Sequence, residues 1–218
     1  MRLHFGDTPI LEYFSVSLDK VFNFEITFPN PFPNEYGLKT SRGIASYRSI
    51  QALFQAWRIK SIVKDSTAHV IEIGAGLGRT AFYAIKLGIH KYTIVDIPFT
   101  SISSSYFLGC TLGEHNLRLH GEECQQKLVN FMTPNEFLDS KKPADLIANF
   151  DSFTEIDKKI AHAYWEHIFL CAPKFLSVNH EANDFRVLDF YLRSPIYNAI
   201  RTPYWMRRGY VEEIISIA

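Results

Sequence analysis

Short apolar runs alternate with longer amphipathic stretches along most of the chain, and this alternation predicts its elements. The short runs have the length of buried strands, whereas the longer stretches carry apolar residues at helical spacing. The predicted strands are 69–73, 92–97, 116–121, 144–150 and 174–180, followed by two extended stretches near 198–205 and 209–217. The predicted helices are 41–64, 79–87, 99–113, 133–140 and 157–172.

Local signals mark the ends of several elements. Gly88 is expected to stop the second helix, because glycine tolerates the left-handed backbone that ends helices. The segment TPNE (133–136) has the spacing of a capping box with proline at the first helical position. Pro31 and Pro33 exclude a helix in their segment, so residues 1–40 are expected to form short strands or an extended arm.

The order of these elements predicts the fold class. Strands that alternate with helices favour a mostly parallel sheet with helices on both faces. We therefore expect a doubly wound, Rossmann-like α/β fold of about seven strands with an N-terminal helical or extended arm. The expected parts are an arm and cap helix at 1–64 and one compact unit at 65–218. Ligands of such sheets bind in the loops beyond the carboxyl ends of the strands.

Composition and charge exclude some classes of partner. The chain has 218 residues, of which 47% are hydrophobic and 21% charged, as expected for one globular domain. The formal net charge is zero, which argues against a nucleic-acid partner held by a broad basic field. The three cysteines have no C-x-x-C spacing, and there is neither a signal-peptide core nor a long apolar run. These features favour a cytoplasmic protein without a membrane span.

The most specific signal is the stretch VIEIGAGLGRTAFYAIKLG. Its three glycines, Gly74, Gly76 and Gly78, follow an apolar strand that holds one carboxylate, Glu72. The dinucleotide fingerprint G-x-G-x-x-G would place the third glycine at position 79, where this chain has Arg79. The observed E-x-G-x-G-x-G form is typical of sheets that bind S-adenosylmethionine (SAM). The amino-acid tail and ribose of SAM need close approach to backbone, which glycine allows.

Other residues complete the expected cofactor site. Asp96 ends the next strand, where its carboxylate can accept hydrogen bonds from both ribose hydroxyls of SAM or, equally, of NAD. Glu122 could face the adenine amino group or be a solvated loop charge, and Asn149 could hold the amino-acid tail or bond only backbone. The expected cofactor-binding residues are Glu72, Gly74, Ala75, Gly76, Gly78, Asp96, Ile97, Glu122 and Asn149.

Two segments carry a resemblance to a known family. The stretch 70–109 has E-I-G-x-G-x-G, then Y-x-x-x-D-x-P and an aromatic–leucine step, and it resembles the sugar O-methyltransferase family. DLIANFDSFTEI (145–156) is similar to that family's fourth-strand segment, and the resemblance spans roughly residues 30–185. It implies the class I methyltransferase fold, SAM as cofactor, and methyl transfer to a hydroxyl of a sugar or glycan intermediate. Arg79 is a departure, because the family often has a small residue there.

Methyl transfer to a hydroxyl also needs a group that accepts the hydroxyl proton. The expected topology brings three candidates near the reactive methyl group. His180 is the first, because an unperturbed imidazole is largely neutral at cellular pH, and Asp151 and Glu155 follow. Each has a plainer alternative. A strand-end histidine often bonds a neighbouring carbonyl, and acids in such a loop often cap the next helix.

The acceptor is expected to be a small molecule or glycan. Glu181 and Tyr204 are the expected acceptor-binding residues, with Trp205 and Arg207 beside Tyr204, because aromatic faces suit sugar rings. The plainer alternative for Tyr204, Trp205 and Arg207 is packing or solvation. No residue spacing predicts a metal site, although Asp151, His180 and Glu181 could converge on a divalent ion. Two other interpretations stay open. One is a nicotinamide-dependent oxidoreductase, against which the missing glycine at position 79 argues. The other is a methyltransferase-fold protein that binds without catalysing.

Overall fold

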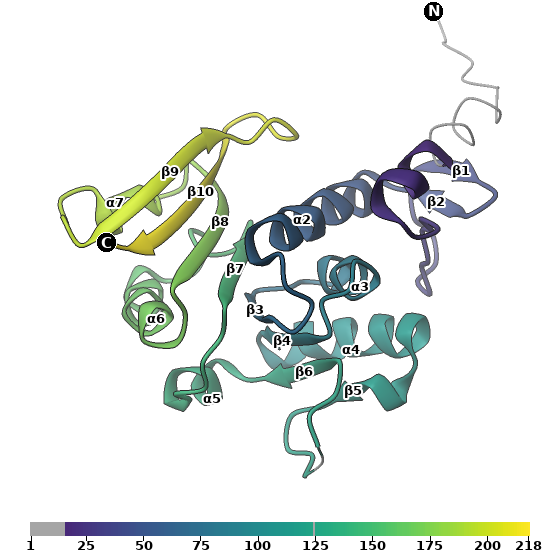
Figure 1. Ribbon diagram of the computed structural model, residues 1–218, viewed down its shortest axis with the longest axis horizontal. Helices are drawn as coiled ribbons and strands as arrows, with labels where there is room; N and C mark the ends of the chain where they lie inside the picture. The colour runs from purple at the N-terminus through teal and green to yellow at the C-terminus, as the bar shows by residue number, and fades with distance from the viewer. Residues whose placement is uncertain (1–15, 124) are drawn as a thin grey trace, which may run out of the picture.

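The computed structural model describes residues 16–123 and 125–218 (Figure 1). Expectations that concern residues 1–15 or Cys124 lie outside the described residues. The strands are β1 (Leu38–Thr40), β2 (Gly43–Ala45), β3 (His69–Ile73), β4 (Lys91–Val95), β5 (Leu117–Arg118), β6 (Val129–Met132), β7 (Leu146–Phe150), β8 (Lys174–His180), β9 (Tyr197–Pro203) and β10 (Tyr210–Ile217). The helices are α2 (Tyr47–Val63), α3 (Arg79–Lys86), α4 (Pro98–Leu112), α5 (Pro134–Asp139), α6 (Lys158–Cys171) and α7 (Leu188–Tyr191), with a helical stretch at 16–22 and a 3-10 turn at Glu114–Asn116.

Eight strands form the main sheet, in the order β5-β6-β4-β3-β7-β8-β10-β9. Neighbouring strands are parallel except that β10 runs antiparallel to β8 and β9. This confirms the predicted mostly parallel α/β fold, with eight strands where about seven were expected. The strand order reverses at β3, which lies between β4 and β7. A reversal of this kind opens a crevice at the carboxyl ends of the strands, where ligands bind.

Each face of the sheet has its own hydrophobic core, because successive strand residues point to opposite faces. Val70 packs in the core that contains residues of α2, α3 and α4. Ile71 and Ile73, on the same strand, pack in the core that contains residues of α5, α6 and α7. Figure 1 shows the two groups of helices on opposite sides of the sheet. The sheet is therefore covered on both faces, and ligands can reach it at the ends of the strands.

Helix α2 begins later than the pattern predicts. The first residues of the expected helix instead form the turn and the second strand of the hairpin β1–β2. Gly43 has a φ of 112°, which a helix does not allow. Ser46 then caps the helix, and its side chain accepts a hydrogen bond from the Ser49 amide at 3.1 Å. Helix α2 packs against α3 and touches β7, so its N-terminal half reaches the crevice beside β3.

The strand beside β4 is not the one that the pattern predicts. The expected strand at 116–121 is reduced to β5, two residues at the sheet edge. The inner position belongs to β6, which was not predicted. Its sequence, VNFM, has only four residues and includes a polar one, which is too short for a periodic signal. The loop 120–123 therefore follows the edge strand, away from the strand next to β4.

The two extended stretches expected near 198–205 and 209–217 form a hairpin that belongs to the main sheet as β9 and β10. β10 starts at the carboxyl end of β8, because Tyr210 pairs with His180. Gly209 precedes it with a φ of 82°, and a Cβ there would lie 2.7 Å from Nε2 of His180. The turn before β10 therefore brings Arg207 and Tyr210 to the same end of the sheet as the glycine loop.

Candidate functional site

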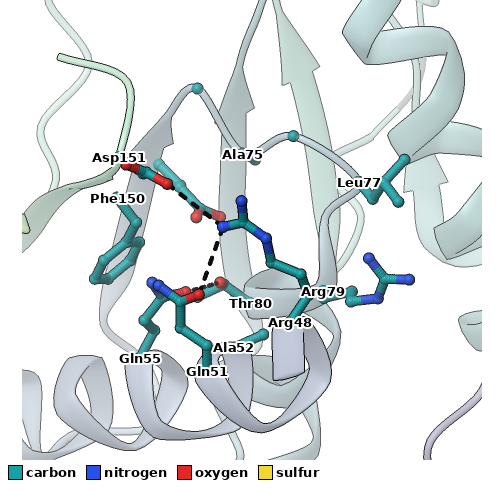
Figure 2. A pocket seen from close by; sticks show the side chains of 13 residues that line it. Arg48, Gln51, Ala52, Gln55, Ala75, Leu77, Arg79, Thr80, Phe150 and Asp151 are labelled. Atoms are coloured by element: carbon teal, nitrogen blue, oxygen red, sulfur yellow. Dashed lines mark hydrogen bonds and ion pairs between the residues drawn. The ribbon is translucent and has the colours of Figure 1, made fainter. Parts of the chain in front are cut away.

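A cavity of about 420 Å³ lies between the glycine loop after β3, helix α2 and the loop after β7 (Figure 2). It is lined by Arg48, Gln51, Ala52, Gln55, Glu72, Gly74, Ala75, Gly76, Leu77, Arg79, Thr80, Phe150 and Asp151. The cavity therefore sits in the crevice where the strand order reverses. Five residues expected from the sequence meet in its wall: Glu72, Gly74, Ala75, Gly76 and Asp151.

The glycine loop turns sharply because its glycines adopt left-handed backbone angles. The φ angles are 72°, 57° and 77° at Gly74, Gly76 and Gly78. A Cβ at Gly74 would lie 2.0 Å from Oγ of Ser152, so this glycine is needed where the loop packs on the loop after β7. A Cβ at Gly76 would meet no atom within 4 Å. The loop is therefore packed tightly against the loop after β7 at Gly74, whereas at Gly76 a ligand can approach the backbone without a side chain in the way.

Asp96 follows β4 and closes the glycine loop from the other side. Its carboxylate accepts hydrogen bonds from the amides of Gly76, at 3.2 Å, and Ile97, at 2.8 Å. Burial raises the pKa of Asp96 above its ordinary value, and these amide hydrogen bonds oppose that effect. A carboxylate is an acceptor with which ligand hydroxyls can form hydrogen bonds. Ile97 is 56% exposed and offers an apolar surface beside it.

Glu72 is buried beneath the glycine loop. It is 1% exposed and accepts a hydrogen bond from the Tyr92 hydroxyl at 2.9 Å. Burial raises the pKa of Glu72 to about 8, and the charge of Asp96 adds to that effect. Glu72 is therefore largely protonated at neutral pH, and it can donate as well as accept a hydrogen bond.

Two buried asparagines hold the loop after β7. Asn149 donates from Nδ2 to the Ile73 carbonyl at 2.8 Å and to Oγ of Ser152 at 2.7 Å. Its Oδ1 accepts from Nδ2 of Asn179 at 2.9 Å and from the Phe153 amide at 3.1 Å. Both ends of the Asn149 amide are thus engaged within the protein, and the residue positions the loop that carries Asp151.

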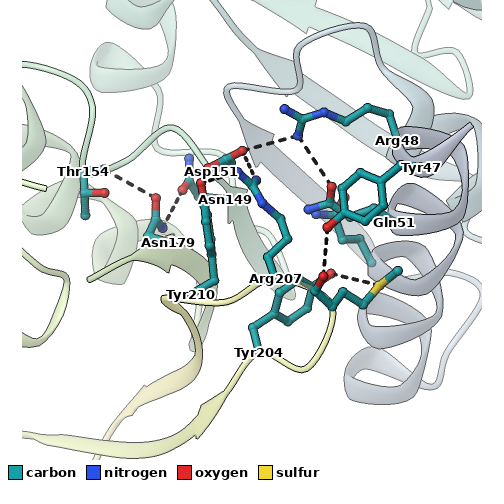
Figure 3. A network of polar contacts seen from close by, with 12 residues as sticks. Tyr47, Arg48, Gln51, Asn149, Asp151, Thr154, Asn179, Tyr204, Arg207 and Tyr210 are labelled. Atoms are coloured by element: carbon teal, nitrogen blue, oxygen red, sulfur yellow. Dashed lines mark hydrogen bonds and ion pairs between the residues drawn. The ribbon is translucent and has the colours of Figure 1, made fainter. Parts of the chain in front are cut away.

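Asp151 is the centre of a charged cluster at the edge of the cavity (Figure 3). Its carboxylate pairs with Arg48 from α2, at 3.4 Å, and with Arg207 from the turn before β10. It also accepts from the Tyr210 hydroxyl, which in turn accepts from Arg207. The φ of Asp151 is 75°, an uncommon value outside glycine, and marks a position under local constraint.

The other two candidate bases, His180 and Glu155, do not line the cavity. Nδ1 of His180 accepts a hydrogen bond from the Ala182 amide at 3.0 Å, and the ring packs edge-on against Tyr210. Glu155 is exposed on the loop before α6. Of the three candidates, all of them within the described residues, Asp151 is the one that lines the cavity.

The expected acceptor residues are engaged within the protein. Tyr204 is 3% exposed and packs in the core against α2, so its ring offers no open face. Glu181 pairs with Arg201 of β9. Glu122 lies on the loop after the edge strand β5, where its carboxylate accepts from a backbone amide of the same loop at 2.8 Å. The loop that holds Glu122 thus follows the edge strand β5 and not the strand next to β4.

Sequence reasoning missed the part of α2 that lines the cavity. Arg48, Gln51 and Gln55 face it, and Gln55 accepts a hydrogen bond from the Thr80 hydroxyl at 2.9 Å. Gln51 and Gln55 are only 3% and 6% exposed. The buried face of an amphipathic helix is ordinarily apolar. Two glutamines four residues apart on that face are therefore a sequence signal that the helix faces a polar cavity.

Arg79, where the chain departs from the family pattern, joins the cavity to the proline-rich segment. It pairs with Glu35 at 2.7 Å, and the two side chains are 15% and 10% exposed. Its guanidinium also lies 5.8 Å from the centre of the Phe107 ring. Position 79 therefore fixes the segment around Glu35 over α3.

Residues 16–123 and 125–218 contain no group of three or more His, Cys, Asp or Glu side chains arranged to hold a metal ion. Within the same ranges, no helix combines the length and the apolar character that a bilayer crossing requires. Cys110 is exposed, Cys171 is buried, and both are free thiols.

The reversed strand order and the glycine loop after β3 define a doubly wound α/β protein. Solved structures narrow the class. The glycopeptide N-methyltransferase MtfA, solved with sinefungin, has a TM-score of 0.58 at 12% identity, covering 77% of this chain and 87% of that chain. PH1948 from Pyrococcus horikoshii, a candidate RNA methyltransferase, has a TM-score of 0.52 at 15% identity, covering 93% and 98%. The mitomycin 7-O-methyltransferase MmcR has a TM-score of 0.52 at 11% identity, covering 77% of this chain but 54% of that chain.

These similarities show the fold, which is that of class I SAM-dependent methyltransferases, as predicted. No family model and no curated protein matches the sequence. The expected cofactor agrees with the neighbours, because MtfA has been solved with the SAM analogue sinefungin and with S-adenosylhomocysteine. The neighbours include N-, O- and RNA methyltransferases, so the fold leaves the acceptor open and does not exclude nucleic acid.

Proposed function

We propose that this protein is a SAM-dependent methyltransferase that acts on a hydroxyl of a sugar or glycan intermediate. One observation carries the cofactor: the Gly76 backbone faces open space while its amide donates to Asp96. Bare backbone for an amino-acid tail and a carboxylate for a ribose thus meet in one crevice. The sugar acceptor is supported by the resemblance of 70–109 and 145–156 to sugar O-methyltransferases.

The residues of the crevice fit the parts of SAM, whose sulfonium supplies an electrophilic methyl group when bound. Asp96 suits the ribose, because its oxygens accept what two hydroxyls donate. Ile97 offers apolar surface to the adenine ring. Gly74 and Gly76, with Ala75 between them, let the tail approach the backbone, and Glu72 lies at the base of the cavity beneath it.

Asp151 is the proposed proton acceptor, ahead of His180 and Glu155, because it lines the cavity. Its Tyr210 partner keeps its own proton, since burial and the Asp151 charge raise the pKa of Tyr210 to about 12. Oδ2 of Asp151 contacts both arginines, whereas Oδ1 accepts from the Tyr210 hydroxyl and can accept a second hydrogen bond, from the acceptor hydroxyl.

Isothermal titration calorimetry of the full chain with S-adenosylhomocysteine, NAD and NADP tests the cofactor. We expect S-adenosylhomocysteine to bind and the two nicotinamide nucleotides to fail. Asp96→Ala should weaken binding about 100-fold or more, because two hydrogen bonds to a charged acceptor are lost. Asp139→Ala, which removes an exposed acid at the end of α5, is the matched control and should change nothing. Binding of NAD or NADP in place of S-adenosylhomocysteine would reject the proposal.

Transfer of a labelled methyl group from SAM to a panel of sugars tests the acceptor. Product on a sugar hydroxyl is the expected result, and Asp151→Asn should reduce its rate without reducing the affinity for S-adenosylhomocysteine. Product on a nitrogen or on RNA would reject the sugar acceptor and keep the methyltransferase. Binding without any transfer would favour the non-catalytic alternative.

A further inference from the structure

Two arginines share one carboxylate at the edge of the cavity (Figure 3). Arg48 and Arg207 both contact Oδ2 of Asp151. Within the described ranges, no second acid forms an ion pair with either arginine. Tyr210 leaves the balance unchanged, because it is neutral near pH 7. The charges of Arg48, Arg207 and Asp151 therefore sum to one positive charge.

The two arginines are held to very different degrees. Arg207 is 22% exposed, and its guanidinium lies 3.7 Å from the centre of the Tyr210 ring. Arg48 is 60% exposed, and its contacts with Asp151 and Gln51 are 3.4 and 3.5 Å long, at the upper limit of a hydrogen bond. Arg207 is thus a fixed charge, whereas Arg48 can exchange its present contacts for stronger ones.

The position of Arg48 in helix α2 is electrostatically unfavourable. It lies in the first turn of α2, which contains no acidic residue. A cation there faces the positive end of the helix dipole, where an acid is favoured. Neither the helix nor its long contacts account for an arginine at this position, so a partner outside the protein chain is the better explanation.

We propose that Arg48, with Arg207 behind it, recognises a carboxylate or phosphate group of a bound ligand, and that Asp151 competes with that group. Guanidinium groups bind both anions through paired hydrogen bonds. The inference rests on the proposed function, under which two ligands can bring such a group. They are the cofactor, through the carboxylate of its amino-acid tail, and an acidic or phosphorylated sugar acceptor.

Calorimetry of the full chain with three probes separates these sources. S-adenosylhomocysteine carries the amino-acid tail, 5′-deoxy-5′-methylthioadenosine lacks it, and inorganic phosphate represents the acceptor's anionic group. The test variant is Arg48→Gln. Its control is Lys60→Gln, which removes one positive charge from the last turn of the same helix.

If the anion is the cofactor's carboxylate, Arg48→Gln should weaken S-adenosylhomocysteine about 10- to 100-fold. Its affinity for methylthioadenosine should stay the same. If the anion belongs to the acceptor, both nucleosides should keep their affinities. Phosphate titrated into the S-adenosylhomocysteine complex should then bind the wild type and fail to bind Arg48→Gln. Either pattern supports the proposal.

Two results would overturn it. One is that Arg48→Gln and Lys60→Gln behave alike with every probe. The other is that Arg48→Gln weakens both nucleosides equally, which would make Arg48 a brace for α2. Wild-type binding of S-adenosylhomocysteine reports on the proposed function separately, and the phosphate titration can be made on the chain alone if that binding fails.

Asp151→Asn tests the competition directly. Asparagine tolerates the φ of 75° and keeps the shape of the side chain while it removes the charge. Binding of the anion that depends on Arg48 should then tighten several-fold. Weaker binding in Asp151→Asn would overturn the role given to Asp151.

Discussion

The two walls of the cavity are built in opposite ways. One wall is the glycine loop, which Asp96 holds through the Gly76 amide. The loop and Asp96 come from one stretch, 72–97, and this wall works largely through backbone groups. The wall around Asp151 joins distant parts of the sequence, because Arg48 lies 103 positions and Arg207 lies 56 positions from Asp151. This wall works through charged side chains. Under the proposed function, the first wall binds the cofactor and the second contacts the acceptor.

Glu72→Gln should produce the largest change in stability, because it removes the buried acid of the first wall. Burial raises the pKa of Glu72 from 4.5 to about 8, so the folded chain keeps a proton that the unfolded chain releases. The stability that this proton contributes is complete below the unfolded value and is lost as the pH rises through about 8.

Urea unfolding at several pH values checks this. Between about pH 5 and pH 8 the wild type should lose about 3 to 5 kcal/mol relative to Glu72→Gln. Asp96 and Glu213, whose pKa values burial also raises, remain in both proteins, so the difference isolates Glu72. Parallel pH profiles for the two proteins would contradict the account.

A pair of glycine substitutions separates the structural and ligand-facing positions of the loop. Gly74→Ala combines a left-handed backbone with a collision at Ser152, and it should cost about 2 to 4 kcal/mol. Gly76→Ala has the backbone penalty alone, about 1 kcal/mol, but should weaken S-adenosylhomocysteine binding. Thermal unfolding and calorimetry measure both quantities. Equal losses of stability at the two positions would remove the distinction.

Tyr210→Phe should have the smallest effect on stability and would sharpen the contrast between the walls. The phenyl ring keeps its packing on His180, and Asp151 keeps its arginines. Urea unfolding should show a loss of about 0.5 to 1.5 kcal/mol, the contribution of one hydrogen-bonding hydroxyl. A loss as large as that of Gly74→Ala would make the second wall a structural support.

The difference between the walls also explains what the sequence could predict. Strand, loop and helix are contiguous from β3 to Asp96, and glycine spacing encodes the backbone angles that shape the loop. β6 was not predicted, because four residues carry no periodicity. Without β6, the loop that holds Glu122 could not be recognised as following an edge strand.

The second wall depends on packing between distant elements. Arg48 reaches Asp151 because α2 packs against α3 and β7. No residue spacing in the sequence indicates how these elements pack. Tyr204 illustrates the same point, because it and Trp205 are adjacent aromatics of which one is buried and the other 72% exposed. Only the buried glutamines of α2 hinted that this helix faces a polar cavity.

A crystal structure with S-adenosylhomocysteine tests directly whether the glycine loop and Asp96 hold SAM between them. The ribose hydroxyls should contact the Asp96 carboxylate, and the amino-acid tail should lie over Gly76. Well-ordered S-adenosylhomocysteine elsewhere on the chain, with Asp96 contacting only protein, would contradict this arrangement.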